Sequence, residues 1–195
     1  METKKTIIFI GNSGCGKGTQ AEILEKRIKE KGEKVLHIEL GDEFRNFLSM
    51  TTDTSRKALE ISQTGQLQPE FLAIHLWSKI LNLYYGKDKF LILDGTPRTL
   101  REAYILDGAL KFYGVENPIV LYIETKRETA KERMLSRKRK DDTEEKIENR
   151  LNWFGRDTEK AIDFFINDSY YDFFKINGEG SIEEIEKEIE EKIKF

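Results

Sequence analysis

Short apolar runs alternate along the chain with longer amphipathic segments. The runs lack polar alternation and are rich in β-branched and aromatic residues, which is typical of strands in a parallel sheet covered on both faces. Between the first two runs, residues 20–28 carry apolar positions on one helix face, and Gly32 follows as a C-terminal cap. The repeated strand–helix–strand pattern predicts an α/β fold, a three-layer α/β/α sandwich. The five expected strands are residues 6–10, 35–38, 90–93, 119–123 and 173–176.

Two long stretches contain no strand pattern, so they interrupt the regular alternation of strands and helices. Residues 42–85, punctuated by Gly65 and Pro69, predict a small helical insertion. Residues 126–167 also have a helical pattern, with a turn expected at 138–141. The chain ends in a segment that predicts a docking helix with a solvated outer face. Its apolar stripe consists of Ile182, Ile185, Ile189 and Ile193.

Composition limits the classes of protein that remain. The 195 residues correspond to one domain, and 38% of them are hydrophobic, which is enough for a core. The 33 Lys and Arg residues against 36 Asp and Glu leave a net charge of −3, so no global field favours nucleic acid or an anionic membrane. The single cysteine excludes an internal disulfide and a cysteine-rich zinc cluster. With no apolar run of membrane-spanning length and no signal-peptide core, we expect a cytoplasmic location.

The strongest chemical motif is a glycine-rich decamer, residues 11–20, between the first strand and the first helix. Its glycines let the backbone curl so that successive N–H groups point into one hollow, and the helix that follows adds its N-terminal dipole. Lys17 adds a charge that can reach the β- and γ-phosphates of a nucleotide. Position 18 is Gly where the general phosphate-loop pattern has Ser or Thr, and the hydroxyl comes at Thr19. The expected ATP-binding residues of this loop are Gly11, Ser13, Gly14, Cys15, Gly16, Lys17, Gly18 and Thr19.

Four motifs in order resemble those of adenylate kinases and related nucleoside monophosphate kinases. The first is the decamer, in which Gly-Lys-Gly-Thr-Gln replaces Gly-Lys-Ser/Thr. The second is Gly-Asp-Glu-Phe-Arg at 41–45, and the third is Asp-Gly-Thr-Pro-Arg-Thr at 94–99. The fourth is the arginine set of residues 133–151, which resembles the arginines that flank the family's lid. Together with the C-terminal strand and helix, these motifs extend the resemblance over nearly the whole chain.

The resemblance implies a fold of the P-loop NTPase, nucleoside monophosphate kinase type. Residues 1–195 would then form a single P-loop kinase domain. Its core would comprise 1–40, 86–136 and 141–195, its monophosphate-binding helical insertion 41–85, and its lid only a vestigial turn at 137–140. The implied reaction is the reversible, Mg²⁺-dependent transfer of the γ-phosphoryl group of ATP to AMP, which gives two ADP.

The resemblance also implies roles for the basic residues. Phosphoryl transfer rests on positioning and on cations that stabilise the transferring group, and guanidinium forks bind phosphate oxygens in pairs. Arg133 and Arg137 would add to the ATP site. The expected catalytic residues are Lys17, Arg98, Arg133, Arg137, Arg139 and Arg150. The expected AMP-binding residues are Leu40, Gly41, Arg45, Gly65, Leu67, Gln68, Gly95, Arg98, Glu102, Arg139 and Arg150.

Two acidic residues are candidates for the magnesium site. Asp94 follows a buried strand and is expected to hold Mg²⁺ through water, with Asp42 as a second candidate. Asp141 and Asp142 are interpreted as helix-capping residues that also brace the arginines. Cys15 is expected to be a small loop residue, and no structural zinc is expected. The partners would be ATP and a nucleoside monophosphate, with no nucleic acid and no membrane, and a monomer is favoured.

Two departures from the family pattern leave the acceptor open. Adenylate kinases usually have Thr where this chain has Leu40, and Gln where it has Glu102. A carboxylate accepts from the exocyclic amines of adenine and cytosine and from guanine, so Glu102 does not by itself select AMP. A kinase for GMP, CMP, UMP or dTMP is therefore the alternative. Thr99, where pyrimidine-specific relatives prefer Asn, disfavours UMP and CMP.

Three readings outside this family remain. A P-loop kinase of a small metabolite is disfavoured by the 41–45 motif and by the helical insertion. A catalytically weak nucleotide-binding regulator would have lost Lys17, Arg98 or the lid arginines, and all are present. A nucleic-acid-binding role would need a coherent basic face, for which residues 126–140 are the one candidate.

Overall fold

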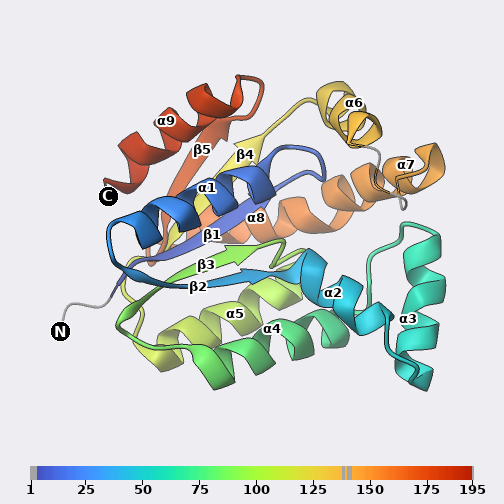
Figure 1. Ribbon diagram of the computed structural model, residues 1–195, viewed down its shortest axis with the longest axis horizontal. Coiled ribbons are helices and arrows are strands. Elements are labelled where there is room, and N and C mark those ends of the chain that lie inside the picture. The colour runs from blue at the N-terminus through green and yellow to red at the C-terminus, as the bar shows by residue number, and fades with distance from the viewer. Residues whose placement is uncertain (1–3, 138, 140–141, 195) are drawn as a thin grey trace.

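The computed structural model describes residues 4–137, 139 and 142–194, and its centre is a five-stranded parallel sheet (Figure 1). Neighbouring strands follow the order β2-β3-β1-β4-β5. All five expected strands are present, each extended by one residue or two. They are β1 (Thr6–Gly11), β2 (Lys34–Glu39), β3 (Lys89–Asp94), β4 (Ile119–Glu124) and β5 (Asp172–Asn177). The α/β class and the parallel sheet predicted from the apolar runs are therefore confirmed.

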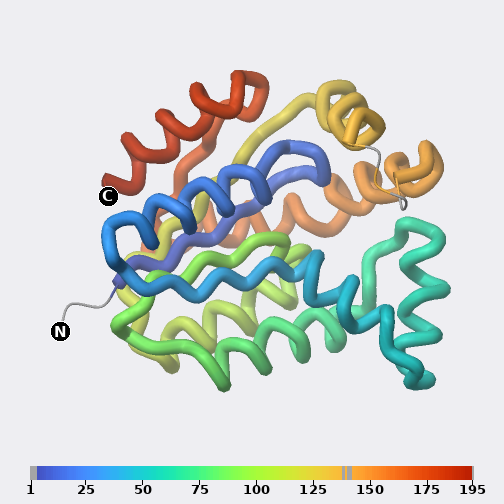
Figure 2. Tube along the Cα trace, in the orientation of Figure 1, coloured from blue at the N-terminus to red at the C-terminus, as the bar shows by residue number. Residues whose placement is uncertain are grey.

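Helices cover both faces of the sheet, as Figure 1 and the chain trace of Figure 2 show. Helices α1 and α9 lie on one face, and α4, α5 and α8 lie on the other. The expected cap at Gly32 is present, since its N–H donates to the Lys29 carbonyl with φ at +77°. The helices are α1 (Lys17–Glu30), α2 (Leu40–Leu48), α3 (Asp53–Gln63), α4 (Glu70–Tyr84), α5 (Leu100–Tyr113), α6 (Arg127–Ser136), α7 (Glu144–Trp153), the π-helix η1 (Phe154–Thr158), α8 (Glu159–Asn167) and α9 (Ile182–Ile193).

Alternate side chains of each central strand enter two separate cores. In β1, Ile8 and Ile10 face the core under α4, α5 and α8, whereas Ile7 and Phe9 face the core under α1 and α9. Because successive side chains of a strand point to opposite faces, a strand that is apolar at every position fits a sheet buried on both sides. The unbroken apolar runs of the sequence thus have a direct structural cause.

The sheet order creates a crevice at its carboxyl edge. Strand β1 pairs with β3 on one side and with β4 on the other, so the chain leaves β1 in one direction and later returns on its other side. In open parallel sheets such a switch point is where ligands bind. Phe9 is paired with Asp94, so the loops that follow β1 and β3 leave the sheet as neighbours. The glycine-rich decamer and the 94–99 motif therefore meet at this edge.

Residues 42–85 are helical, as expected, but they do not form one separate unit. Helix α4 contacts α2, α5 and β2, and its fully buried Trp77 belongs to the same core as the sheet. Helix α3 extends away from the sheet (Figure 2). The division into a core and an insertion at 41–85 stays a prediction, and in it α4 also serves as part of the covering layer. Of the predicted lid turn, Lys138 and Lys140 lie outside the described residues, as does Asp141.

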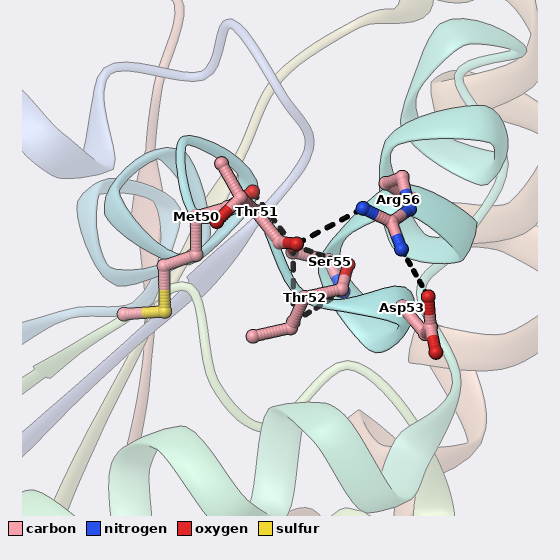
Figure 3. A network of polar contacts seen from close by, with 6 residues as sticks. All are labelled: Met50, Thr51, Thr52, Asp53, Ser55 and Arg56. Carbon is pink, nitrogen blue, oxygen red and sulfur yellow. Dashed lines mark hydrogen bonds and ion pairs between the residues drawn. The ribbon is translucent and has the colours of Figure 1, made fainter.

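A compact polar network fixes the turn between α2 and α3 (Figure 3). The Thr52 side chain caps α3 by accepting from the Ser55 backbone N–H at 3.1 Å. The buried Ser55 hydroxyl in turn donates to the Met50 carbonyl at 2.7 Å. Arg56 donates to the Thr51 carbonyl at 3.0 Å. Because a turn held by both side chains and backbone has few alternatives, α3 starts in one defined direction from α2.

The C-terminal helix differs from its predicted stripe at one position. Ile185, Ile189 and Ile193 are buried against α1 and the sheet, but Ile182 is 51% exposed and lies at the edge of the large cavity described below. A capping box between Ser181 and Glu184 starts the helix at this point. In the part of the chain that the structure describes, no helix has the length and apolar character needed to span a membrane.

Candidate active site

One cavity of about 710 Å³ lies at the carboxyl edge of the sheet. Its walls come from the loops after β1, β3 and β5 and from helices α1, α2, α6 and α7, so nearly the whole chain contributes to it. Seven of its ten charged lining residues are lysine or arginine, as expected for a site that binds several phosphates. Seventeen of the 23 predicted site residues line it: Ser13, Gly14, Gly16, Lys17, Gly18, Thr19, Gly41, Arg45, Gly65, Gln68, Asp94, Gly95, Arg98, Arg133, Arg137, Arg139 and Arg150.

The phosphate loop has the predicted strand–loop–helix form. Gly16, the N-cap of α1, has φ at +96°, a conformation that side-chain-bearing residues rarely adopt. Lys17 begins α1, lines the cavity and donates from Nζ to the Asn12 carbonyl at 3.2 Å. The N-terminal N–H groups of α1 and the Lys17 ammonium therefore lie at one end of the cavity, where they can bind an anion.

Asp94 fits the part of a residue that holds hydrated magnesium. It is only 5% exposed, yet it lines the cavity, and its Oδ1 has no hydrogen-bond partner among the described residues. A Cβ atom on Gly18 would lie 3.3 Å from Asp94 Oδ2, so Gly at position 18 leaves space beside this carboxylate. A buried, unpartnered carboxylate oxygen beside a phosphate loop is a donor that Mg²⁺ or its bound water can use. Among the described residues, no group of three or more His, Cys, Asp or Glu side chains is arranged so that it could hold a metal ion.

Arg98 is held on several sides at the edge of the cavity. Its Nε donates to the Gly95 carbonyl at 2.8 Å, and its Cζ lies 5.6 Å from the centre of the Trp153 ring. The Thr158 hydroxyl donates to the Arg98 carbonyl at 2.8 Å. Burial lowers the pKa of the guanidinium, while the charges of Glu102 and Asp94 act in the opposite direction. Because the ordinary pKa of arginine is above 12, the group remains a cation, and its position is defined by the surrounding contacts.

A buried aspartate joins two of the lid arginines. Asp142, whose side chain is 1% exposed, accepts from Arg137 Nε at 2.6 Å and from Arg150 Nη1 at 2.6 Å. Arg137 also donates from Nη2 to the same carboxylate at 3.1 Å, so that contact is bidentate. A single carboxylate thus orients guanidinium groups from both sides of the short connection between α6 and α7. The expectation that Asp142 braces the arginines is confirmed, but the expectation that it caps the next helix is wrong, because Thr143 is the N-cap of α7.

Arg133 has a more structural environment than the sequence indicated. Its Nη1 donates to the Gly178 carbonyl at 2.8 Å and to the Cys15 carbonyl at 3.4 Å, and its Nη2 donates to the Gly180 carbonyl at 3.4 Å. The side chain therefore ties the loop before α9 to the phosphate loop while it lines the cavity. It can contribute charge to the site without leaving these contacts.

Arg45 lines the cavity, but both nearby carboxylates are paired with it. It forms ion pairs with Glu39, at 3.0 Å, and with Asp42. Asp42 is half-exposed and is not among the described residues that line the cavity. The structure therefore contradicts Asp42 as a second metal candidate, because its carboxylate is turned to Arg45 rather than to the phosphate loop.

Besides Asp42, five predicted residues do not line the cavity: Gly11, Cys15, Leu40, Leu67 and Glu102. Gly11 and Cys15 support the loop from beneath: a Cβ on Gly11 would lie 2.6 Å from Cys15 Sγ, and the Cys15 side chain is buried in the core under α1. Burial raises the pKa of the Cys15 thiol, in line with its interpretation as a small loop residue. Leu40 is fully buried in the opposite core, and Leu67 packs against that core. The side chains of Cys15, Leu40 and Leu67 thus stabilise the site from behind, and the absence of a side chain at Gly11 leaves room for Cys15.

The structure corrects the role predicted for Glu102. Its side chain is fully buried, and its Oε2 accepts from the Arg98 backbone N–H at 3.0 Å and from the Thr96 hydroxyl at 3.4 Å. The Glu102 N–H donates to the Thr99 side chain, which caps α5. The predicted contact with the acceptor base is therefore wrong for this structure. Glu102 instead fixes the 96–98 turn that carries Arg98.

This position of Glu102 predicts a pH-dependent stability. Burial raises its pKa above the ordinary value of 4.5, so the folded chain holds the proton to higher pH than the unfolded chain. The stabilisation from Glu102 is then complete below about pH 4.5 and is lost as the pH rises through the folded-state pKa. Relative to Glu102→Gln, the wild type should lose free energy of unfolding as the pH rises above about 4.5 in denaturant titrations.

The exposed Glu60→Gln serves as the reference variant in the same titrations. The Glu102→Gln variant should also keep the acceptor preference of the wild type, because this side chain does not reach the cavity. A change of preferred monophosphate in Glu102→Gln would contradict the assignment.

Several cavity residues were missed by sequence reasoning. Trp153 was interpreted as a core residue; it is 6% exposed and does belong to the core, but one part of it lines the cavity. Ile182 was assigned to the packed stripe. The loop before α9 has no motif, although its Gly-Glu-Gly-Ser sequence after a strand is a weak signal of a ligand loop. The residues missed are Gln20, Glu22, Glu39, Phe44, Leu48, Ser62, Gln66, Trp153, Gly180, Ser181, Ile182 and Ile185.

The basic segment 126–140 does not form an open cationic face where it is described. Arg127 and Lys131 both pair with Glu148, Arg137 pairs with Asp142, and Arg133 points into backbone carbonyls. Arg133 and Arg137 line the cavity and are not gathered on an outer surface, and Arg127 and Lys131 share one carboxylate. The nucleic-acid reading thus loses its one candidate surface in this part of the chain.

Comparison with known proteins identifies related sequences that match most of the chain. A family model described as "Adenylate kinase" matches residues 9–170. A protein named "Adenylate kinase" from a strain of Prochlorococcus marinus is 35% identical over 97% of this chain and 99% of its own length. "Adenylate kinase 1" from Nostoc sp. is 34% identical over 94% and 95%, and "Adenylate kinase" from Corynebacterium diphtheriae is 35% identical over 92% and 93%.

Proposed function

Since the chain belongs to the adenylate kinase family, we propose that its cavity binds Mg·ATP and AMP together and transfers the γ-phosphoryl group between them to give two ADP. The observation that carries this proposal is the convergence of Lys17 and six arginines on one cavity. Transfer between two bound nucleotides needs oriented cations and exclusion of water, and no covalent intermediate. A site with this lining is suited to that task.

The donor nucleotide is assigned to the end of the cavity formed by the phosphate loop. The N–H groups at the start of α1 and Lys17 would bind the β- and γ-phosphates. Gly180, Ser181 and Ile182 are assigned to the rest of the donor, because Arg133 ties their loop to the phosphate loop. Half-exposed Ile182 offers apolar surface to a base.

The acceptor is assigned to the end formed by α2, the α3–α4 loop and the turn after β3. Arg98 would bind the acceptor phosphate as a fixed fork, with Arg45 as its second cation once the phosphate displaces Glu39 and Asp42. Arg137, Arg139 and Arg150 also line the cavity and would stabilise the charge of the transferring group. Gly65 and Gln68 would line the acceptor base.

Adenylate kinases generally use Mg²⁺ with ATP, and we assign its water-mediated contact to Asp94. When bound with ATP, the metal neutralises charge that develops on the phosphates. The part played by Asp94 is to orient water at the end of the phosphate loop with its unpartnered oxygen. Asp42 is left out of this assignment.

The two departures that had left the acceptor open do not argue against AMP. Leu40 is fully buried in the core, and Glu102 is buried beneath the Arg98 turn. Neither side chain lines the cavity, so neither is in a place to choose a base. Since neither residue argues for another base, the resemblance to adenylate kinases supports AMP as the acceptor.

A coupled assay of diphosphate formation tests the proposal. With Mg·ATP and each of AMP, GMP, CMP, UMP and dTMP, AMP should be the preferred acceptor. Formation of two ADP per AMP consumed is the expected stoichiometry. If no monophosphate is converted, the proposed function fails, and if another one is preferred, the acceptor assignment fails.

The short lid predicts a measurable side reaction. Only Lys138 separates Arg137 from Arg139 in the sequence, so no lid domain can cover the donor. We expect the site to be wetter, and more ATP to be hydrolysed without acceptor, than in a long-lid relative. The test is to measure the ATPase rate of both enzymes without acceptor, at equal kinase activity. A rate for this chain no higher than that of the relative would contradict the prediction.

A further inference from the structure

Helix α7 carries the loop between α3 and α4. The loop runs from residue 64 to residue 69, and its first three residues, 64–66, are called the α3–α4 corner below. Asn149 donates from Nδ2 to the Thr64 carbonyl at 2.7 Å, and Trp153 donates from Nε1 to the Gly65 carbonyl at 3.2 Å. Asn149 and Trp153 are four residues apart, so they lie on the same face of α7. Two successive carbonyls of the corner are thus bound by one helix face.

The backbone at the corner lies directly on α7. Gly65 has φ at +71°, and a Cβ atom on it would lie 2.7 Å from both the Cα and the carbonyl oxygen of Lys146. Lys146 precedes Asn149 by three residues and therefore belongs to the same face. Only glycine permits this approach, so the corner has little freedom to move along the helix.

Trp153 also touches the residue assigned to the acceptor phosphate. The Arg98 guanidinium lies over its ring, with Cζ 5.6 Å from the ring centre. The same side chain therefore donates through its N–H to the corner and supports Arg98 with its ring. Burial alone would not require tryptophan here, because a leucine or phenylalanine could fill the core but could not make both contacts.

We propose that Trp153 is a positioning residue that sets the distance between the α3–α4 corner, which lines the acceptor base, and Arg98, which binds the acceptor phosphate. This inference rests on the proposed function, because the acceptor roles of Arg98 and Gly65 belong to it. Trp153 acts on the acceptor only: its two contacts lie on the acceptor side, and the donor loops are held by Lys17 and Arg133.

Three variants separate the two contacts. Trp153→Phe keeps a ring under Arg98 and removes the donor to Gly65. Asn149→Ala is its companion variant, because it removes the neighbouring bond to Thr64, leaves the ring untouched and so shows the effect of one lost bond to the corner. Trp153→Leu removes both contacts of Trp153. Steady-state kinetics with AMP and ATP varied separately, and thermal unfolding, are measured for each.

The expected result is a split between the two substrates. One lost hydrogen bond should raise the KM for AMP about threefold in Trp153→Phe and in Asn149→Ala, with kcat unchanged. Trp153→Leu should raise it about tenfold and lower kcat about tenfold, because Arg98 also loses its support. The KM for ATP should stay within about twofold throughout. An equal rise in the KM for AMP and the KM for ATP, or an unchanged KM for AMP, would overturn the inference.

Fluorescence gives a second readout that does not depend on the leucine variant folding. The chain has two tryptophans, and the other, Trp77, is fully buried in the core. AMP should change the emission of the wild type and leave that of Trp153→Phe unchanged. An equal change in both would overturn the inference. AMP binding without any diphosphate formation would instead contradict the proposed function, and the emission comparison would still decide on Trp153.

Discussion

Replacement of Arg98 by alanine should lower kcat/KM for AMP about a thousandfold, the scale of removing an arginine that stabilises a phosphoryl transition state. The wild-type guanidinium is held by the Gly95 carbonyl and the Trp153 ring before any substrate arrives. Since the position of the guanidinium is already defined, its removal should affect phosphoryl transfer and leave the donor site folded. The dissociation constant of ATP, measured by calorimetry, should change less than about twofold.

Two further variants make this result specific. Arg98→Lys keeps the charge but loses the planar fork and the stacking on Trp153, so it should remain at least about tenfold impaired. Arg101→Ala removes an exposed arginine three residues away, whose one described ion pair is a 3.5 Å contact with Glu70, and should behave as wild type. Equal weakening of ATP and AMP by Arg98→Ala would place this arginine between the substrates rather than on the acceptor.

Asp142→Asn should lower kcat about a hundredfold, comparable to the loss of one oriented charge-stabilising group. The carboxylate binds Arg137 and Arg150 at once from a position that is 1% exposed. An amide keeps the shape but presents an N–H to one of two cations, so at least one guanidinium should leave its place. The KM for ATP should change little, because the phosphate loop is untouched.

The matched control for this variant is Asp157→Asn. Asp157 also forms a bidentate contact with an arginine, Arg156, through Nε to Oδ1 and Nη2 to Oδ2, but that arginine is 65% exposed on the surface of η1. Exposed pairs contribute little, so this variant should keep wild-type kcat and melting temperature. Wild-type kcat in Asp142→Asn, at an unchanged melting temperature, would mean that Arg137 and Arg150 need no common carboxylate.

The five strands and most helices could be predicted because a local pattern of apolar and polar residues indicates each of them. Runs such as residues 6–10 are apolar at every position, which only a doubly covered strand explains. The phosphate loop and the arginines were equally accessible, since glycine spacing and residue type carry their chemistry. The placement of Lys17, Arg98, Arg137 and Arg150 on one cavity agrees with those predictions.

The errors concern the direction of side chains. Glu102 and Leu40 occupy positions that the motifs associate with the base, yet both are buried away from the cavity. Asp42 shares a helix with Arg45 and pairs with it. A motif specifies where the backbone runs, but a small rotation of a helix or a nearby partner decides which side chains reach the ligand.

By itself, then, the sequence determined the parallel α/β sheet, the phosphate loop and the identity of the cationic residues, because these depend on neighbours within a few positions. Only the tertiary structure decided that Asp142 joins two arginines, that Glu102 supports a turn, and that Trp153 links Arg98 to a corner 88 residues earlier in the chain. Such contacts form when elements distant in sequence pack together. Their energies depend on distance and direction across that packing, which no local pattern encodes.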